Sequence, residues 1–231
     1  MARPADTARP TAAAVLDDAV RALAPDTGTN RLVAQIAAGQ APRAVFTTFA
    51  LEQHQIIAAD RLSFQHLARR ADADPPVADF FDLLAEGEAL ALKQLAGLAD
   101  ACELTDREIS AYEPRPGCQA YPSYAARLAL GAEPTDVVIA LSANFAAWGA
   151  YCGTVAAAMR AHYGFPESAL GFFAFFTEPA TDVAERADAA LQHGLDTGQA
   201  RPETAHRYGR LLQAYELMFW HSLTDGPASS S

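Results

Sequence analysis

Hydrophobic residues recur three and four positions apart along almost the whole chain of 231 residues. This spacing places them on one side of an α-helix, whereas the alternating polarity of β-strands is hard to find. The pattern therefore predicts an all-α protein. The expected helices cover about residues 12–24, 30–38, 42–70, 77–102, 119–130, 133–164, 167–176, 182–195 and 202–224, with a short helical segment around "TDREISAY".

Proline and capping residues mark the expected ends of these helices. Pro42 stands in a first turn, where proline is tolerated, and Thr105 with Glu108 forms a capping-box pattern. The segments "DADPP" and "EPRPG" break the chain. Neither an internal repeat nor an interdomain linker is visible. We expect one domain of eight or nine helices over residues 11–224, with disordered tails at 1–10 and 225–231.

The last helix carries an acid on its apolar side. The helix is expected over "YGRLLQAYELMFWHSL", Tyr208–Leu223. Seen along its axis, Glu216 falls inside the arc of apolar side chains that is centred on Leu212. Its angular neighbours, Ala205 and Gly209, are small and leave space beside the carboxyl group. A buried charge without a partner is costly, so Glu216 either forms a salt bridge or hydrogen bond between helices or belongs to a site.

Other long helices show the same feature. Glu88 lies on the apolar stripe of its helix, Gln53 and Asp60 lie on that of the helix starting at Pro42, and Asn144 on that of the helix after "EPTD". Each alone is explained as a satisfied core group. If they converge, they form a mostly apolar cavity with a few directed polar atoms, which is typical of small-ligand sites. Aromatic residues at similar positions would hold a flat heterocycle: Phe49, Tyr121, Trp148, Phe176 and Phe219.

Charge and composition narrow the possible partners. The net charge of −11 and a pI near 4.9 disfavour binding to nucleic acid or to an anionic membrane. The 23 uncharged residues from Val137 to Met159 are long enough to span a bilayer, but they include Ser142, Asn144 and Thr154 and lack dense leucine and isoleucine. We therefore expect a central bundle helix there, and neither a nucleic-acid nor a membrane partner.

The cysteines and the first residues indicate the compartment. The start of the chain has no apolar core of the kind that a secretory signal needs, so the cytoplasm is the expected location. The three cysteines, Cys102, Cys118 and Cys152, are odd in number and widely spaced, which fits neither a disulfide framework nor a zinc site. We expect reduced thiols, no cofactor and no bound metal.

Three motifs resemble the TenA, or thiaminase II, family. They are "PGCQAYPSYAARLA", "ALSANFAAWGAYCG" and "QAYELMFW", starting at residues 116, 140 and 213. The resemblance implies a haem-oxygenase-like bundle, assembled as a homodimer or homotetramer, with a buried pocket for the aminopyrimidine part of degraded thiamine. It also implies that Glu216 acts in proton transfer, that Tyr121 lines the pocket, and that Trp148 replaces another pocket aromatic.

Two departures from the family pattern affect the chemistry. Asn144 stands where the family has a nucleophilic cysteine, and an amide has no ionisable thiol-like group, so covalent catalysis there is excluded. Cys152 lies two turns further along, roughly 12 Å away, which is too far to replace it. Gln53 stands where cysteine-bearing members have an aspartate that contacts the pyrimidine; it still offers hydrogen bonds but no charge.

The sequence is compatible with three functions. The leading hypothesis is a hydrolase that cleaves a C–N bond of an aminopyrimidine, with Glu88 and Glu216 as paired acid and base activating water. The second is a ligand-binding or assembly protein that kept the pocket and lost the reaction. The third is a di-iron oxidase using Glu52, Glu88 and Glu216, although histidine ligands are missing near Glu88.

Overall fold

A computed structural model of the chain describes residues 10–26 and 28–224. Within these residues there is no β-strand, which confirms the all-α prediction. Most of the predicted tail at 1–10 and all of that at 225–231 lie outside the described residues. The α-helices number ten in the described part, rather than eight or nine, because short segments form separate helices. Their bounds are α1 (Ala12–Leu23), α2 (Arg31–Ala37), α3 (Ala44–Arg70), α4 (Pro75–Ala101), α5 (Asp106–Ala111), α6 (Pro116–Gly131), α7 (Pro134–Ala158), α8 (Gly171–Phe175), α9 (Thr181–Thr197) and α10 (Pro202–Ser222).

Most of these helices start where local chemistry favours a start. Proline occupies the first turn of α4, α6, α7 and α10, where its missing N–H costs no hydrogen bond. Thr11 and Asn30 cap α1 and α2 with their side-chain oxygens. The predicted capping box of Thr105 and Glu108 is present at the start of α5. A π-helical turn, Met159–Tyr163, extends α7, and a 3₁₀ turn, Glu167–Leu170, leads into α8.

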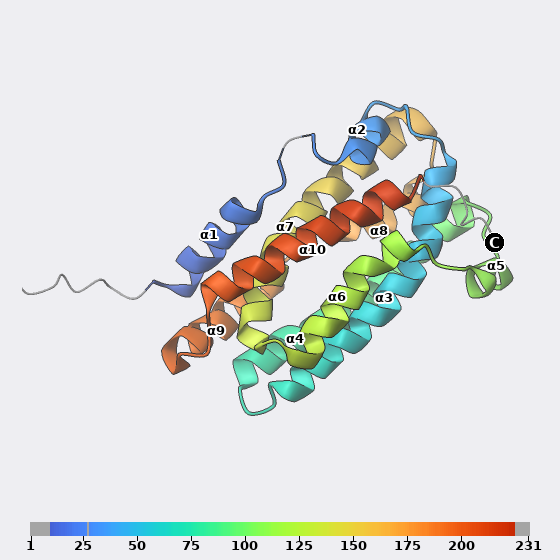
Figure 1. The fold of residues 1–231 in the computed structure, drawn as a ribbon. Helices are drawn as coiled ribbons and strands as arrows, with labels where there is room; N and C mark the ends of the chain where they lie inside the picture. Colours follow the sequence, from blue (N-terminus) through green and yellow to red (C-terminus); the bar gives the residue numbers. More distant parts are fainter. Residues whose placement is uncertain (1–9, 27, 225–231) are drawn as a thin grey trace, which may run out of the picture.

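The long helices α3, α4, α6, α7 and α10 run roughly along one direction and form the body of the bundle (Figure 1). Helix α3 packs on α4 and α6, while α10 packs on both α6 and α7. Helices α1 and α9 pack against α7, and α8 packs against α4 and α7. The space enclosed by α3, α4, α6, α7 and α10 is therefore bordered by residues far apart in the sequence.

Helix α7 is the central helix that its uncharged sequence predicted. Together with the π-helical turn, Pro134–Tyr163 is long and apolar enough to cross a membrane by length and composition. All residues from Pro134 to Leu141 are buried, and α1, α2, α9 and α10 pack around the helix. The first half of α7 is thus buried on every side, as in a core helix of a globular bundle, which explains its lack of an amphipathic pattern. The second half has exposed small and polar residues at Ala146, Ala150 and Thr154.

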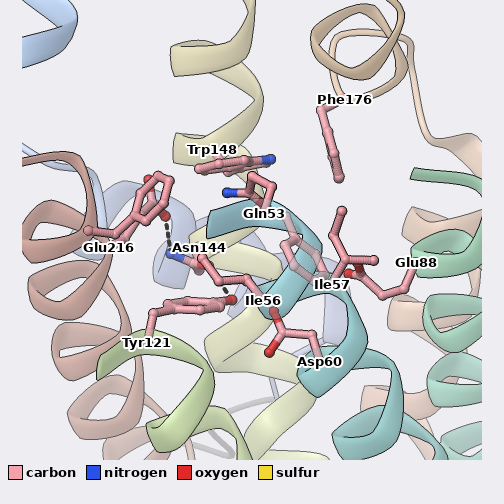
Figure 2. A pocket seen from close by; sticks show the side chains of 12 residues that line it. Gln53, Ile56, Ile57, Asp60, Glu88, Tyr121, Asn144, Trp148, Phe176 and Glu216 are labelled. Atoms are coloured by element: carbon pink, nitrogen blue, oxygen red, sulfur yellow. Dashed lines mark hydrogen bonds between the residues drawn. The ribbon is translucent and has the colours of Figure 1, made fainter. Parts of the chain in front are cut away.

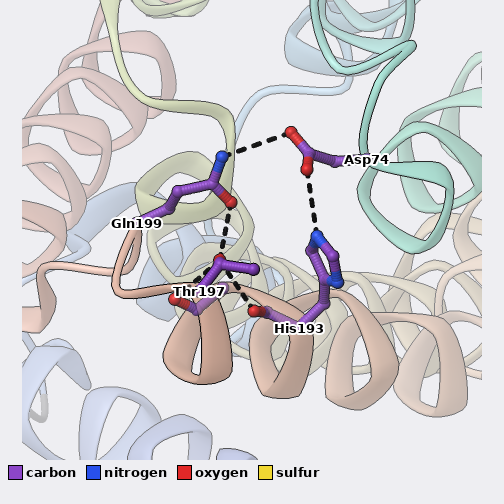
Figure 3. A network of polar contacts seen from close by, with 5 residues as sticks. Asp74, His193, Thr197 and Gln199 are labelled. Atoms are coloured by element: carbon purple, nitrogen blue, oxygen red, sulfur yellow. Dashed lines mark hydrogen bonds and ion pairs between the residues drawn. The ribbon is translucent and has the colours of Figure 1, made fainter.

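Two polar networks fasten helix ends without taking part in the central cavity. Glu52 on α3 accepts hydrogen bonds from the Tyr112 hydroxyl (2.6 Å), the Arg115 backbone N–H (2.8 Å) and Gln119 Nε2 (3.1 Å). At the other end, Asp74 pairs with His193 Nε2 (3.0 Å) and accepts from Gln199 Nε2 (3.3 Å), which ties the start of α4 to the end of α9 (Figure 3). These carboxylates have partners and a structural role.

A glycine sets the distance between α4 and the 3₁₀ turn. A Cβ atom at Gly97 would lie 2.0 Å from the backbone oxygen of Ser168, which cannot rotate away. We predict that Gly97→Ala lowers the free energy of unfolding by about 1–3 kcal/mol, measured by urea denaturation. Gly87→Ala on the same helix is the matched control, because nothing lies within 4 Å of its Cβ position. It is expected to raise stability by about 0.5–1 kcal/mol. Equal effects of the two substitutions would contradict this packing.

Candidate functional site

The inward polar residues of five helices line one cavity. The cavity is small: the volume open to the centre of a water molecule is about 50 Å³. Its walls come from α3, α4, α6, α7 and α10, and Phe176, next after α8, completes them (Figure 2). The lining residues are Gln53, Ile56, Ile57, Asp60, Glu88, Tyr121, Asn144, Phe145, Trp148, Phe176, Glu216 and Phe219. The structure thus brings Gln53, Glu88, Tyr121, Asn144, Trp148, Phe176 and Glu216 together around one hollow.

A chain of hydrogen bonds connects α6, α7 and α10 along one side of the cavity. The Tyr121 hydroxyl donates to Asn144 Oδ1 (3.0 Å), and Asn144 Nδ2 donates to Glu216 Oε2 (2.6 Å) (Figure 2). Asn144 is 2% exposed and is held at both ends of its amide. It is therefore a satisfied core group and a cavity-lining residue at once, and it fixes the orientation of the Glu216 carboxyl.

Glu216 is only 4% exposed, and its second oxygen, Oε1, is buried without a hydrogen-bond partner. Burial raises the pKa of Glu216 to about 8, although Asn144 and the nearby Trp220 indole lower it. The Trp220 Nε1 atom lies close, but its geometry does not complete a hydrogen bond. In the described part of the chain, Glu216 forms no salt bridge. The carboxyl group of this cavity-lining residue therefore keeps an acceptor that no hydrogen bond in the described part of the chain uses.

Two further acids lie across the cavity from Glu216, Asp60 on α3 and Glu88 on α4 (Figure 2). Burial raises the pKa of Asp60 to about 8, and burial together with the Asp60 charge raises the pKa of Glu88 well above its usual value. Asp60 is 5% exposed, and its Oδ1 atom is buried without a hydrogen-bond partner. Burial raises the pKa of the Tyr121 hydroxyl well above its usual value, and the charges of Asp60, Glu216 and Glu88 raise it further.

The sequence placed Asp60 on the inward stripe but did not assign it to the site. The available signal was its spacing of seven residues from Gln53, which puts both on one face two turns apart. Ile56, Ile57 and Phe145 also line the cavity, although they were not singled out as ligand contacts. Apolar residues on an inward stripe give no sign of which will border a void and which will be fully packed.

Aromatic rings form the apolar walls. Trp148 packs edge-on against Phe176, with ring centroids 5.9 Å apart, and is tilted against Phe219 at 6.1 Å. Phe49 was expected to contact a ligand, but it is not among the lining residues. It is 2% exposed and stacks on Trp148 at 6.2 Å with an interplanar angle of 10°. Phe49 therefore supports the ring that lines the cavity.

A surface groove adjoins the cavity on the side of α1, α7 and the start of α9. Phe145 and Phe176 line both hollows, so aromatic rings separate the buried space from the surface. Four acidic residues are among those that line the groove: Asp17, Glu178, Glu185 and Asp188. A groove with carboxylates and no basic residue in its lining favours the approach of a cation over that of an anion.

The structure also locates residues considered for other chemistry. Glu52 does not line the cavity, because it is bonded to Tyr112 and Arg115 in the segment between α5 and α6 and to Gln119 of α6. The three glutamates of the di-iron alternative therefore do not meet. Within residues 10–26 and 28–224, no group of three or more His, Cys, Asp or Glu side chains is placed to hold a metal ion. Cys152 is fully buried outside the lining, and burial and then Glu216 raise the pKa of its thiol well above the usual value.

Comparisons with known proteins agree with this architecture. A TenA homologue from P. horikoshii OT3 has a similar structure, with a TM-score of 0.65 and 14% identity over 90% of this chain and 94% of that one. At that identity the similarity concerns the fold, which is the haem-oxygenase-like all-α bundle expected from the sequence. A search of curated proteins gave no match. The sequence profile of the TENA/THI-4/PQQC family matches residues 29–226. The chain therefore belongs to the TENA/THI-4/PQQC family.

Proposed function

We propose that this TenA-like protein binds a small aminopyrimidine-type heterocycle in the central cavity and hydrolyses one of its C–N bonds without a covalent intermediate. The observation that carries the proposal is Glu216, a buried carboxyl whose Oε2 is fixed by Asn144 and whose Oε1 has no hydrogen-bond partner. Such a group is oriented to bind or transfer a proton in a water-poor site. Family membership and the TenA homologue support a thiamine-related substrate.

Recognition of the ring follows from the walls. Trp148 and Phe176 offer aromatic surfaces to a flat molecule, while the Gln53 amide and Tyr121 hydroxyl offer hydrogen bonds at its edge. An aminopyrimidine combines a flat ring with amino donors and ring-nitrogen acceptors. A protonated aminopyrimidine would also match the acidic lining. Its positive charge and a carboxylate of the lining would pair with each other, so neither charge would be buried alone.

The two glutamates have different neighbours, an amide donor beside Glu216 and a second acid beside Glu88, and this difference assigns their roles. Glu216, with a pKa of about 8, is ionised in part at neutral pH and receives a hydrogen bond from Asn144 at its Oε2. Burial and the charge of Asp60 raise the pKa of Glu88 well above its usual value, which favours its protonated form. Glu216 is thus the base and Glu88 the acid. Water forms the new C–O bond at the carbon of the C–N bond that is cleaved and gives a proton to Glu216. The C–N bond breaks, and the leaving nitrogen receives the proton of Glu88.

A covalent route is closed in this site. Asn144 occupies the position of the family's cysteine, and its amide is fully used in holding Glu216 and accepting from Tyr121. Cys152 is a protonated, buried thiol outside the cavity lining. Because the lining contains no Cys, Ser, Thr or Lys side chain, direct attack by water is the route that we propose.

The proposal is tested with a panel of amino- and formylamino-pyrimidines. We predict that at least one raises the melting temperature of the purified protein and is hydrolysed, with ammonia or formate released in proportion to enzyme. The binding is expected to stabilise the protein by about 2.7 kcal/mol at a hundredfold excess over Kd. A panel that neither binds nor reacts removes the proposed ligand class.

A ligand that binds without turnover would favour the non-catalytic alternative. That alternative has an observation of its own, because the pKa of about 8 leaves most Glu216 protonated at neutral pH and Asn144 offers no nucleophile. Under either function we propose a cytoplasmic homodimer or homotetramer that binds neither nucleic acid nor membrane, consistent with the net charge of −11.

A further inference from the structure

The second half of α10 holds a buried donor and a buried acceptor that each lack a partner. The donor is the indole Nε1 atom of Trp220, whose side chain is fully buried, and the acceptor is Glu216 Oε1. Buried polar atoms without a hydrogen bond are rare in folded proteins, because each has given up its bond to water. A donor and an acceptor left over in one place would satisfy each other.

Helical geometry brings these two side chains together. Glu216 and Trp220 are four residues apart on α10, so they lie on the same face in successive turns. Side chains of a helix lean towards its N-terminus, which carries the Trp220 ring over the turn of Glu216. The indole N–H is near enough to the carboxyl group to lower its pKa. The two groups therefore need only a small side-chain rotation to pair.

The aromatic rings around Trp220 offer its N–H no oxygen acceptor. Phe219, Trp148 and Phe49 lie closest, with ring centroids 5.4, 5.5 and 5.7 Å from that of Trp220. They belong to α10, α7 and α3, so the indole plane is held from three helices. A buried tryptophan usually finds a partner for its N–H. Packing alone explains a large ring at this position, but it does not explain an indole beside a carboxyl group.

We propose that Trp220 is a positioning residue for Glu216, and that its indole N–H donates to Glu216 Oε1 when this carboxyl group is ionised. The consequence for catalysis rests on the proposed function: the base is then held by two donors, Asn144 at Oε2 and Trp220 at Oε1. A carboxylate oxygen has two lone pairs, so Oε1 can still receive a proton from water. The bond is stronger to the ionised carboxylate than to the neutral acid, so it favours the form that acts as a base.

Other titratable groups face this pair and have to be distinguished from Glu216. Burial raises the pKa of Tyr151 and Cys152 on α7, and the Glu216 charge raises it further. Burial, Asp60 and Glu216 act in the same way on Tyr121 of α6. Asp60 on α3 titrates in the same range as Glu216, because burial raises its pKa to about 8. The charged residues of α1 and α2, which also pack on α10, are exposed. The remaining charged or titratable groups near the pair are Glu52, Glu88, Arg115, Cys118 and His221.

The test follows the indole signals of the unligated protein by nuclear magnetic resonance. The chain has two tryptophans, so nitrogen-labelled protein gives two indole N–H signals, and Trp148→Phe identifies the one from Trp220. Between pH 6 and pH 10 the Trp220 proton is expected to move downfield with a midpoint near the Glu216 pKa of about 8, because a hydrogen bond to a carboxylate deshields it. Glu216→Gln is expected to abolish this shift. Asp60→Asn and His221→Gln are the controls and should keep it.

A second measurement uses Trp220→Phe, which keeps a ring in the core but removes the donor. Loss of a donor to the ionised form raises the Glu216 pKa, by about one unit for a hydrogen bond to a charged group. The ionised fraction at pH 7 then falls about tenfold. For an aminopyrimidine substrate, kcat/KM is expected to fall by the same factor at pH 7 and to approach the wild-type value near pH 10. A ring with only a packing role would lower it by a similar factor at every pH.

The two measurements separate this inference from the proposed function. A Trp220 signal that does not move with pH, or that moves equally in Glu216→Gln, overturns the pairing while the ring site stands. A loss of kcat/KM in Trp220→Phe that is uniform across pH overturns the positioning role. If the Trp220 signal follows Glu216 but no pyrimidine is hydrolysed, the pairing stands and the proposed hydrolysis fails. The titration of wild-type protein needs no substitution at Trp220, so it decides the pairing even if Trp220→Phe does not fold.

Discussion

Substituting Glu216→Gln is expected to lower kcat/KM for an aminopyrimidine substrate by about 10²–10⁴-fold, the usual contribution of a positioned acid or base. Glutamine keeps the shape and can still meet Asn144, whose amide holds Glu216 Oε2 at 2.6 Å, but it cannot take a proton from water. The loss should therefore appear mainly in kcat. Binding of a protonated aminopyrimidine is expected to weaken as well, because its carboxylate partner is gone.

Steady-state kinetics with a pH profile check this result. Because the base must be ionised, wild-type activity is expected to rise from pH 6 towards pH 8, following the Glu216 pKa of about 8. Glu203→Gln, at an exposed position on the same helix, is the control and should keep the wild-type profile. If Glu216→Gln retains kcat within threefold and shows the same rise with pH, Glu216 is not the base.

The stability of the unligated protein is expected to fall as the pH rises from about 5 to 8, and Asp60→Asn is expected to remove a large part of this fall. The pKa of Asp60 is about 8 in the folded chain and 3.8 as the reference for the unfolded one. The folded state thus holds a proton that the unfolded state loses, so stability is full below pH 3.8 and lost as the pH passes towards 8. At about 1.4 kcal/mol per pH unit, the change from this group amounts to several kcal/mol.

Urea unfolding at intervals between pH 5 and pH 9 measures the effect. Asparagine has no charge to bury, so the variant should become more stable than wild type above pH 8, with the difference shrinking as the pH falls. Glu88→Gln should act in the same direction, because burial raises the pKa of Glu88 and Asp60 adds to it. Glu86 is exposed on α4, so the free energy of unfolding of Glu86→Gln should change with pH in parallel with that of wild type. If the stability of Asp60→Asn changes with pH in parallel with that of wild type, Asp60 is not a buried acid without a charged partner.

The sequence by itself determined the helical architecture and the side of each helix that holds the polar residues. The prolines at the starts of α7 and α10 and the capping box at Thr105 fixed boundaries by local chemistry, whereas α4 and α6 begin at Pro75 and Pro116, a little earlier than the expected residues 77 and 119. The inward direction of Gln53, Glu88, Asn144 and Glu216 follows from the 3.6-residue period, which is a property of the individual helix. Family motifs then pointed to Tyr121 and Trp148.

Only the tertiary structure decided which inward residues meet. Glu52 and Gln53 are adjacent in sequence and both buried, yet Glu52 is bonded to Tyr112 and Arg115 while Gln53 lines the cavity. Phe49 lies behind Trp148, and Glu88 has Asp60 as its acidic neighbour rather than Glu216. The physical reason is that helical period fixes only the angle of a side chain about its own axis. The distances between side chains on different helices depend on how those helices pack, and packing is set by the whole core.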